Sequence, residues 1–174
     1  MTGKRAFLTR PRERYKDSYI EAVYEYIREK RSVSWHPDIL RTRFDQYLKV
    51  VEQAEAEPLA GMVPSSLFWL IADDDGYIGD VDVRHYLIDS LMRYGGHIGY
   101  KIRPSCRRRG YGALICRLGI EQARLLGIGD ILITCDDDNI GSAKIIEANG
   151  GVLQDKIDNN RGVLTRRYWI RAAD

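Results

Sequence analysis

The segment with the clearest chemical potential is rich in arginine and glycine and spans residues 102–114. It reads Ile-Arg-Pro-Ser-Cys-Arg-Arg-Arg-Gly-Tyr-Gly-Ala-Leu, so the basic run 107–109 is followed by Gly110 and Gly112. The two glycines allow a ligand to approach the backbone closely. If a helix begins here, its first N–H groups have no intrahelical acceptors, and its dipole adds about half a positive charge. These features predict an anion site suited to a pyrophosphate.

This segment differs from two familiar phosphate-binding motifs. No Gly-Lys-Ser/Thr sequence follows the glycines, as a Walker A loop requires. The spacing also departs from the G-x-G-x-x-G fingerprint of dinucleotide-binding proteins. From spacing alone, an exposed basic helix start whose glycines serve packing explains the segment equally well.

The elements that must position this segment follow from hydrophobic periodicity and turn residues. An apolar stripe over 19–27 predicts a helix that starts near Pro11, and a second stripe ending at Val51 predicts a helix after Pro37. Residues 55–66 resemble a loop, and 86–95 contain a short helical turn. We expect strands at 6–9, 66–72, 77–85, 96–103, 130–135, 152–157 and 163–170, and further helices at 109–126 and 139–149.

Turns and helix faces complete this prediction. Asp75–Gly76 is a strong hairpin signal, and residues 159–162 form the last turn. Strand–helix–strand runs in the second half imply at least one parallel pair of strands. For the helix at 109–126 we expect an apolar face made of Tyr111, Leu114, Ile115, Leu118, Leu125 and Leu126.

Composition narrows the class of protein. The 174 residues include 27 basic and 25 acidic side chains, which give a net charge of +2. This balance argues against a dedicated nucleic-acid-binding protein, because such proteins usually carry a strong basic excess. No shift in composition marks a domain boundary, so we expect one domain over residues 1–174.

The cysteines and the apolar runs suggest a location. The sequence has an odd number of cysteines, namely Cys106, Cys116 and Cys135. Their spacing fits no zinc motif, so we expect no metal. Residues 1–14 lack the apolar core of a secretory signal. No run approaches the ~20 apolar residues that cross a bilayer. The sequence therefore predicts reduced thiols, a cytoplasmic location and no membrane partner.

Several motifs, in order, resemble the GNAT family of N-acetyltransferases. Arg107-x-x-Gly110-x-Gly112 matches the family's R/Q-x-x-G-x-G/A motif, and G-Y-K-I-R-P before it resembles the family's fourth strand. Asn139 and Ser142 resemble the N-x-x-S/A segment after the fifth strand, and E-A-N-G-G resembles the end of the following helix. The resemblance covers roughly residues 15–171 and extends to a group of predicted bacterial acetyltransferases of unassigned substrate.

The resemblance implies both a fold and a co-substrate. The expected fold is a mixed α/β (α+β) structure, with a central sheet of about six to seven strands splayed between strands 4 and 5 and about four flanking helices. Acetyl-CoA would enter this gap, its pantetheine arm pairing with the fourth strand and its pyrophosphate held by backbone N–H groups. The implied cofactor-binding residues are Tyr100, Lys101, Ile102, Arg107, Arg108, Arg109, Gly110, Tyr111, Gly112, Ala113, Asn139 and Ser142.

The resemblance also implies a reaction. A primary amine, more often a small molecule than a protein, would attack the thioester directly while both substrates are bound. Many family members protonate the leaving thiolate with a tyrosine seven residues after the asparagine, but that position holds Ile146 here. A glutamate base found in some members falls near Gly96. His97 and His85 are therefore the candidate catalytic residues, and Arg84 and Trp35 are candidate substrate contacts.

Three alternatives stay open at this point. Ile146 is compatible with a non-catalytic acyl-CoA-binding module, which would bind tightly without turnover. Cys135 paired with a histidine would imply an acetyl-enzyme intermediate. A nucleic-acid-binding domain that uses the arginines would show affinity that falls steeply with salt. The resemblance also allows a homodimer, which is common in the family.

Overall fold

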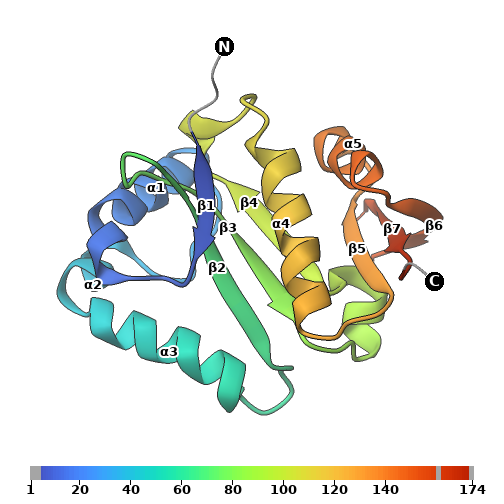
Figure 1. Cartoon of the computed structure of the whole chain (residues 1–174), viewed down its shortest axis with the longest axis horizontal. Coiled ribbons are helices and arrows are strands. Elements are labelled where there is room, and N and C mark those ends of the chain that lie inside the picture. The colour runs from blue at the N-terminus through green and yellow to red at the C-terminus, as the bar shows by residue number, and fades with distance from the viewer. Residues whose placement is uncertain (1–4, 160–161, 173–174) are drawn as a thin grey trace.

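The computed structural model describes residues 5–159 and 162–172, whose strands form one seven-stranded sheet. Its order is β1-β2-β3-β4-β5-β7-β6, and neighbours are antiparallel except for the parallel pair β4–β5. This arrangement confirms the predicted fold class (Figure 1). The strands are β1 (Ala6–Thr9), β2 (Ser65–Ala72), β3 (Tyr77–Arg84), β4 (Ile98–Ile102), β5 (Ile131–Asp136), β6 (Val152–Asp158) and β7 (Leu164–Ile170).

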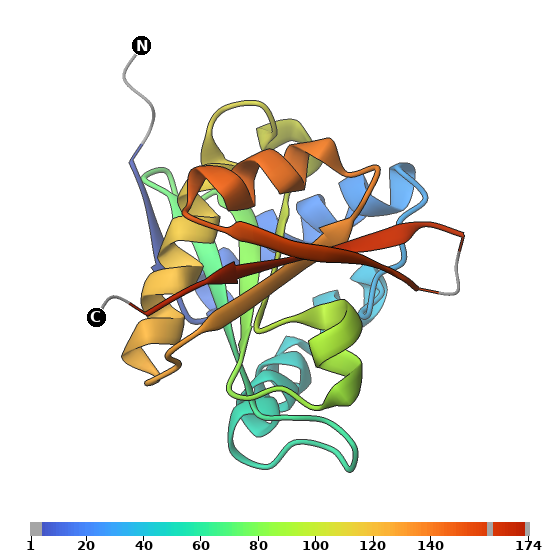
Figure 2. The same cartoon turned by 90° about the vertical axis from the view of Figure 1, so that its right-hand side faces the viewer.

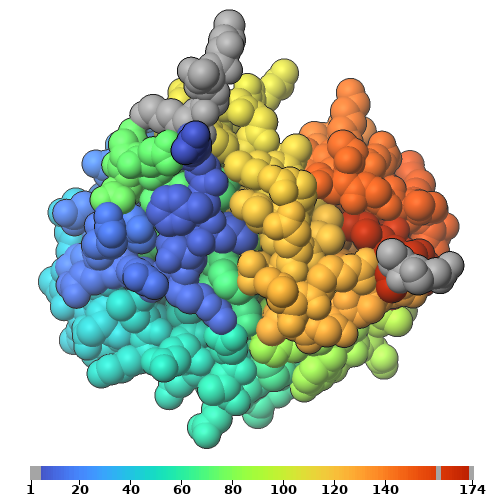
Figure 3. All heavy atoms as spheres, in the orientation of Figure 1, coloured from blue at the N-terminus to red at the C-terminus, as the bar shows by residue number. Residues whose placement is uncertain are grey.

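Helices cover both faces of the sheet. They are α1 (Lys16–Arg28), α2 (Pro37–Thr42), α3 (Phe44–Ala56), α4 (Tyr111–Leu125) and α5 (Ile140–Ala148). Helices α1–α3 lie beside β1–β3, whereas α4 and α5 lie beside β4 and β5 (Figure 1). Atoms of α4 cover much of the face seen in Figure 3. Figure 2 shows β5, β7 and β6 crossing the molecule with α5 above them.

The two faces have separate hydrophobic cores. Trp69 and Ile71 of β2 face α1–α3, and the Trp69 ring lies 4.4 Å from that of Tyr19 between centroids. Leu70, the residue between them, packs instead with Ile115 of α4. Successive strand residues point to opposite faces, so a strand buried on both sides is apolar throughout. This explains the continuous run Ser-Leu-Phe-Trp-Leu-Ile-Ala in β2.

Strands β4 and β5 touch at one point and then diverge toward their C-terminal ends (Figure 1). Their register contains a single pair, Ile98–Ile133. Next to it, the His97 N–H donates a 2.7 Å hydrogen bond to the Leu132 carbonyl. Gly96 has φ +63°, and a Cβ there would lie 2.5 Å from the Leu132 oxygen. Glycine is therefore required for the close approach from which the splay begins.

Two sequence predictions about helices were wrong. The helix expected after Pro37 is interrupted at Arg43 (φ −135°, ψ 41°), so it forms α2 and α3, and α3 continues to Ala56. Leu125 is 78% exposed and does not join the apolar face of α4. It follows the buried Ala123 by two residues, about 200° around a helix. Leu126 is also exposed, whereas the predicted Tyr111, Leu114, Ile115 and Leu118 do pack against the core. The fully buried residues of α4 are Ile115, Cys116, Gly119 and Ala123.

Other local predictions are confirmed. Apart from the division into α2 and α3, the order of strands and helices matches the prediction. The turn expected within 86–95 is a π-helical turn at Leu91–Gly95. Of the last predicted turn, residues 160 and 161 lie outside the described residues. No helix in the described part of the chain is long and apolar enough to cross a membrane.

Candidate functional site

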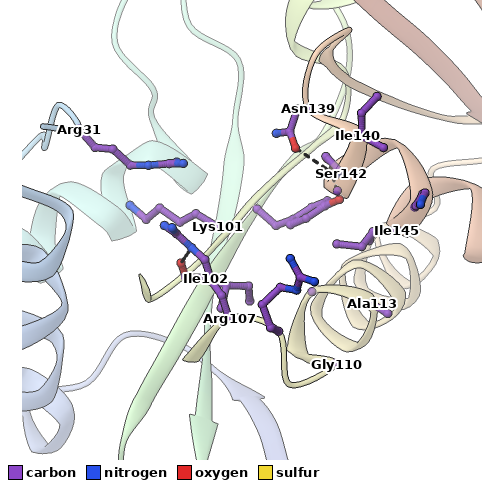
Figure 4. A pocket seen from close by; sticks show the side chains of 15 residues that line it. Arg31, Lys101, Ile102, Arg107, Gly110, Ala113, Asn139, Ile140, Ser142 and Ile145 are labelled. Atoms are coloured by element: carbon purple, nitrogen blue, oxygen red, sulfur yellow. Dashed lines mark hydrogen bonds between the residues drawn. The ribbon is translucent and has the colours of Figure 1, made fainter. Parts of the chain in front are cut away.

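A cavity of about 740 Å³ lies where β4 meets the first turns of α4 and α5, and we call it the basic cavity. Arg31, Lys101 and Arg107 project from one side, and Asn139, Ser142 and Ile145 from the other (Figure 4). Arg109 and Tyr111 are not among the residues that line it. The structure brings together the other predicted cofactor-binding residues: Tyr100, Lys101, Ile102, Arg107, Arg108, Gly110, Gly112, Ala113, Asn139 and Ser142.

The N-terminus of α4 forms one end of this cavity. Gly110 is its N-cap with φ +83°, and Arg108 before it is also left-handed, with φ +62°. The first amides of α4 therefore follow a tight turn, and such amides can bind an anion. A Cβ on Gly112 would lie 2.6 Å from Ile145 Cδ1, so this glycine also lets α4 approach α5 closely.

Positive charge lines the basic cavity. Besides Lys101, Arg107 and Arg108, the cavity contains Arg31 and Lys144, which no sequence motif indicated. Arg107 is fixed, because it donates to Glu29 at 2.8 Å and to the Ile102 carbonyl at 3.2 Å. A cavity with these cations and a helix N-terminus suits a ligand that carries several phosphates.

The loop between β4 and α4 is attached to α1. Arg103 donates to Glu25 at 2.7 Å, and the Ser105 N–H donates to the same carboxylate at 2.9 Å. Burial opposes ionisation of Glu25, but hydrogen bonds from Ser105 and Arg103 outweigh it and lower the Glu25 pKa. The carboxylate is therefore an ionised anchor that fixes the loop relative to α1.

A second cavity, of about 500 Å³, lies on the α1–α3 face of the sheet, and we call it the aromatic cavity. Trp35 and Arg84, the two predicted substrate contacts, both line it, as do Tyr19 and Tyr47. It shares Tyr100 and Lys101 of β4 with the basic cavity. The aromatic and aliphatic side chains of this cavity can pack against an elongated or aromatic ligand.

Two carboxylates line the aromatic cavity, and the sequence prediction missed both. Asp80 accepts a 2.6 Å hydrogen bond from the Tyr77 hydroxyl, and its carboxylate lies 3.3 Å from Lys101 Nζ. Burial raises the pKa of Asp82, although Arg84 at 3.8 Å opposes this shift. The available signal was the alternation of Asp80, Asp82 and Arg84 in β3, which places them on one face.

A third cavity, of about 330 Å³, occupies the gap between β4 and β5, and we call it the connecting cavity. It shares Arg84, Gly99 and Tyr100 with the aromatic cavity, and Tyr100, Asn139 and Ser142 with the basic cavity. Tyr100 thus lines all three. Ligands held in the basic and aromatic cavities would meet at this residue.

The predicted catalytic histidines lie outside the lining of these three cavities. His97 is 7% exposed, and its Nδ1 atom accepts a 3.0 Å hydrogen bond from the Leu132 N–H. Burial lowers the His97 pKa, with a smaller contribution from Arg84. The Nε2 atom of His85 lies 2.8 Å from Ser66 Oγ, which donates to Glu55. A catalytic role for either histidine stays a prediction, and the geometry favours structural hydrogen bonds.

Two other predicted positions have clear surroundings. Ile146 is fully buried in the α4–α5 core, so an aliphatic side chain occupies the family's tyrosine position. Cys135 lines the connecting cavity, and burial raises its pKa to about 11, which keeps the thiol protonated and a weak nucleophile. Among the described residues, no group of three or more His, Cys, Asp or Glu could hold a metal ion.

A sheet that opens between two parallel strands, with a basic cavity and an aromatic cavity that meet at the opening, is the architecture of an acyl-CoA-dependent N-acetyltransferase. The family model of the acetyltransferase (GNAT) domain matches residues 7–152. The chain therefore belongs to the GNAT acetyltransferase family.

Solved structures share this fold at low sequence identity. RimL, a ribosomal L7/L12 alpha-N-protein acetyltransferase in complex with coenzyme A, has a TM-score of 0.67 and 16% identity, covering 96% of this chain and 94% of that one. A mutant spermidine/spermine N-acetyltransferase SpeG from Vibrio cholerae has a TM-score of 0.62 and 15% identity, covering 96% of this chain and 95% of that one. YncA from Salmonella typhimurium, with its cofactor acetyl-CoA, has a TM-score of 0.62 and 12% identity, covering 97% of this chain and 95% of that one. No curated protein matched the sequence.

Proposed function

We propose that this enzyme transfers the acetyl group of acetyl-CoA to a primary amine, and that its acceptor is a small molecule in preference to a protein. The observation that carries the proposal is the meeting of the basic and aromatic cavities at the β4–β5 gap, beside Tyr100. Each substrate has its own cavity, so direct attack within a ternary complex requires no covalent intermediate.

The basic cavity supports the choice of acetyl-CoA. The first amides of α4 and the side chains of Arg107 and Arg108 would hold the pyrophosphate, and the β4 backbone would pair with the pantetheine arm. Asn139 Oδ1 already caps α5 by accepting from the Ser142 N–H at 3.1 Å. Its amide nitrogen is the donor left for the pantetheine arm. A backbone N–H near Tyr100 or Ile102 would stabilise the oxyanion, which is worth roughly 3–4 kcal/mol.

The aromatic cavity supports the choice of an amine. Asp80 and Asp82 are carboxylates that can accept hydrogen bonds from an amine, although Lys101 and Arg84 pair with them. The aromatic walls contributed by Trp35 and Tyr47 suit a small cationic body. A free alkylamine has a pKa near ~10 and must lose a proton before attack. Asp82 is the group we assign to this step, because burial raises its pKa and so makes it a stronger base than an ordinary carboxylate.

A screen for CoA release tests this proposal. Purified protein is offered acetyl-CoA with a panel of small amines and, separately, with peptides that carry free amino groups. We expect turnover with small amines. A Gly112→Asp variant should bind acetyl-CoA at least ~10-fold more weakly, because it adds bulk and negative charge at the start of α4.

Gly112→Ala is the matched control for this experiment. Its methyl group meets only the flexible end of Ile145, so we expect a smaller loss of affinity than for Asp. If calorimetry detects no binding of acetyl-CoA to the wild-type protein, the proposed function fails. Turnover with peptides alone would overturn the choice of a small acceptor.

We also propose that residues 1–174 act as one acetyltransferase domain, since one continuous sheet runs from β1 to β6. A cytoplasmic location is in keeping with the free thiols of Cys106, Cys116 and Cys135. The homodimer and the lack of nucleic-acid and membrane partners stay predictions from the sequence, and size-exclusion chromatography with light scattering tests the first.

A further inference from the structure

The proposed reaction needs a proton donor, and the family's usual position for it in α5 does not supply one. When the C–S bond breaks, sulfur departs as a thiolate, which is a better leaving group when it is protonated. Ile146, at the family's usual position for the acid, is buried and aliphatic. A donor must therefore come from another residue that reaches the gap between β4 and β5. This inference rests on the proposed function.

Tyr100 of β4 reaches that gap from the opposite direction. It pairs in register with Val81 of β3, whose side chain belongs to the α4–α5 core, so the Tyr100 ring projects toward α5. Its hydroxyl lies 2.9 Å from Ser142 Oγ, in the first turn of α5. Tyr100 is half-buried, and as a residue it lines the basic, aromatic and connecting cavities, where the two substrates would meet.

We propose that Tyr100 is the catalytic acid that protonates the sulfur of CoA as the thioester breaks. The amine nitrogen donates its electron pair to the acetyl carbon, and a C–N bond forms. The C–S bond breaks, and its electron pair stays on sulfur. The phenolic proton of Tyr100 transfers to sulfur, and the amine proton leaves through the base. The products are an amide and CoA thiol, and the phenolate regains its proton from solvent.

The surroundings of Tyr100 suit an acid. Burial raises the pKa of the phenol, so it is protonated at neutral pH. The ionisable groups that face it are the thiols of Cys116 and Cys135, whose own pKa values burial raises to about 12 and about 11. Neither thiol is ionised at neutral pH. Ser142 can donate to the phenol oxygen, which leaves the phenol hydrogen for sulfur and stabilises the phenolate.

A Tyr100→Phe variant tests the inference, because it removes only the hydroxyl. We expect kcat to fall by about 100-fold with acetyl-CoA and an accepted amine, while the Kd of acetyl-CoA stays within about twofold. Tyr168→Phe is the matched control. The Tyr168 hydroxyl also bonds α5, at 3.0 Å to Glu147, but Tyr168 is fully buried and lines none of the three cavities.

A binding experiment isolates the contact between the phenol and sulfur without turnover. Free CoA should bind Tyr100→Phe several-fold more weakly than wild type, whereas desulfo-CoA, which lacks the sulfur, should bind both proteins equally. Unchanged kcat in Tyr100→Phe, or an equal loss for CoA and desulfo-CoA, overturns the role of Tyr100 and leaves the acetyltransferase assignment intact. Wild-type protein that binds no CoA overturns both.

Discussion

The side chain of His97 lies where β4 and β5 meet, and its Nδ1 atom accepts a hydrogen bond from the Leu132 N–H. An acceptor at Nδ1 places the proton of the neutral ring on Nε2. Burial lowers the His97 pKa and so favours this neutral form. The ring thus satisfies a buried amide at the point where the parallel pairing of the strands stops.

We predict that His97→Ala lowers the free energy of unfolding by about 1–3 kcal/mol, because it leaves the buried Leu132 N–H without its acceptor. Urea unfolding measures this loss. His97→Asn is the control, since its amide oxygen can accept a hydrogen bond but its side chain cannot act as a base. Turnover per folded molecule should survive both changes. Lower turnover in both, with acetyl-CoA affinity unchanged, would support the catalytic role expected from the sequence.

At the scale of elements, the function depends on how the β4–α4 loop is fixed against α1. Glu25 of α1 accepts hydrogen bonds from Arg103 and Ser105 in that loop. Arg107 donates to Glu29, the residue that follows α1. The loop precedes the amides proposed to hold the pyrophosphate. A loop held in advance loses less conformational entropy when a ligand binds, which favours affinity.

We predict that Glu25→Gln lowers the free energy of unfolding by about 1–3 kcal/mol at neutral pH, because Arg103 loses its charged partner in a largely buried ion pair. The folded pKa of Glu25 is lowered, so its stabilisation is complete above the ordinary carboxyl pKa and is lost as pH falls through the folded value. Thermal melts from neutral to acidic pH should therefore fall less steeply in the variant.

Glu21→Gln is the control for this ion pair. Glu21 binds the same arginine at 3.1 Å, but its side chain is 67% exposed, and exposed pairs contribute little. Equal melting curves for Glu25→Gln and wild type at every pH would show that the loop is not held by this carboxylate.

At the scale of the whole molecule, two compartments meet at the opening of the sheet. The basic cavity is bounded by α4 and α5, the aromatic cavity by α1 and α3, and the two adjoin at the β4–β5 gap. Two substrates can therefore be bound at the same time, each within its own compartment. This arrangement predicts how the reaction rate depends on the concentrations of both substrates.

We predict that initial velocities measured against both substrates give intersecting lines. Desulfo-CoA should compete with acetyl-CoA but not with the amine, because the proposal places the two substrates in different cavities. Parallel lines would instead indicate an acetyl-enzyme intermediate, and Cys135 in the connecting cavity would then be the residue to examine.

Much of the fold could be predicted because its signals are local. The order of strands and helices follows from apolar periodicity and from turns such as Asp75–Gly76. The start of α4 follows from Gly110 and the adjacent arginines. The break at Arg43 could not be predicted in this way, because neither proline nor glycine marks it.

The sequence by itself determined the family motif, the start of α4 where we propose that an anion binds, and most of the lining of the basic cavity. Only the tertiary structure decided that Arg31 joins that cavity, that Asp80 and Asp82 face an aromatic one, and that the Tyr100 hydroxyl reaches α5. The physical reason is distance along the chain. A helix start is built from neighbouring residues, whereas a cavity wall is assembled from residues dozens of positions apart, and their meeting depends on how the sheet twists and where it opens.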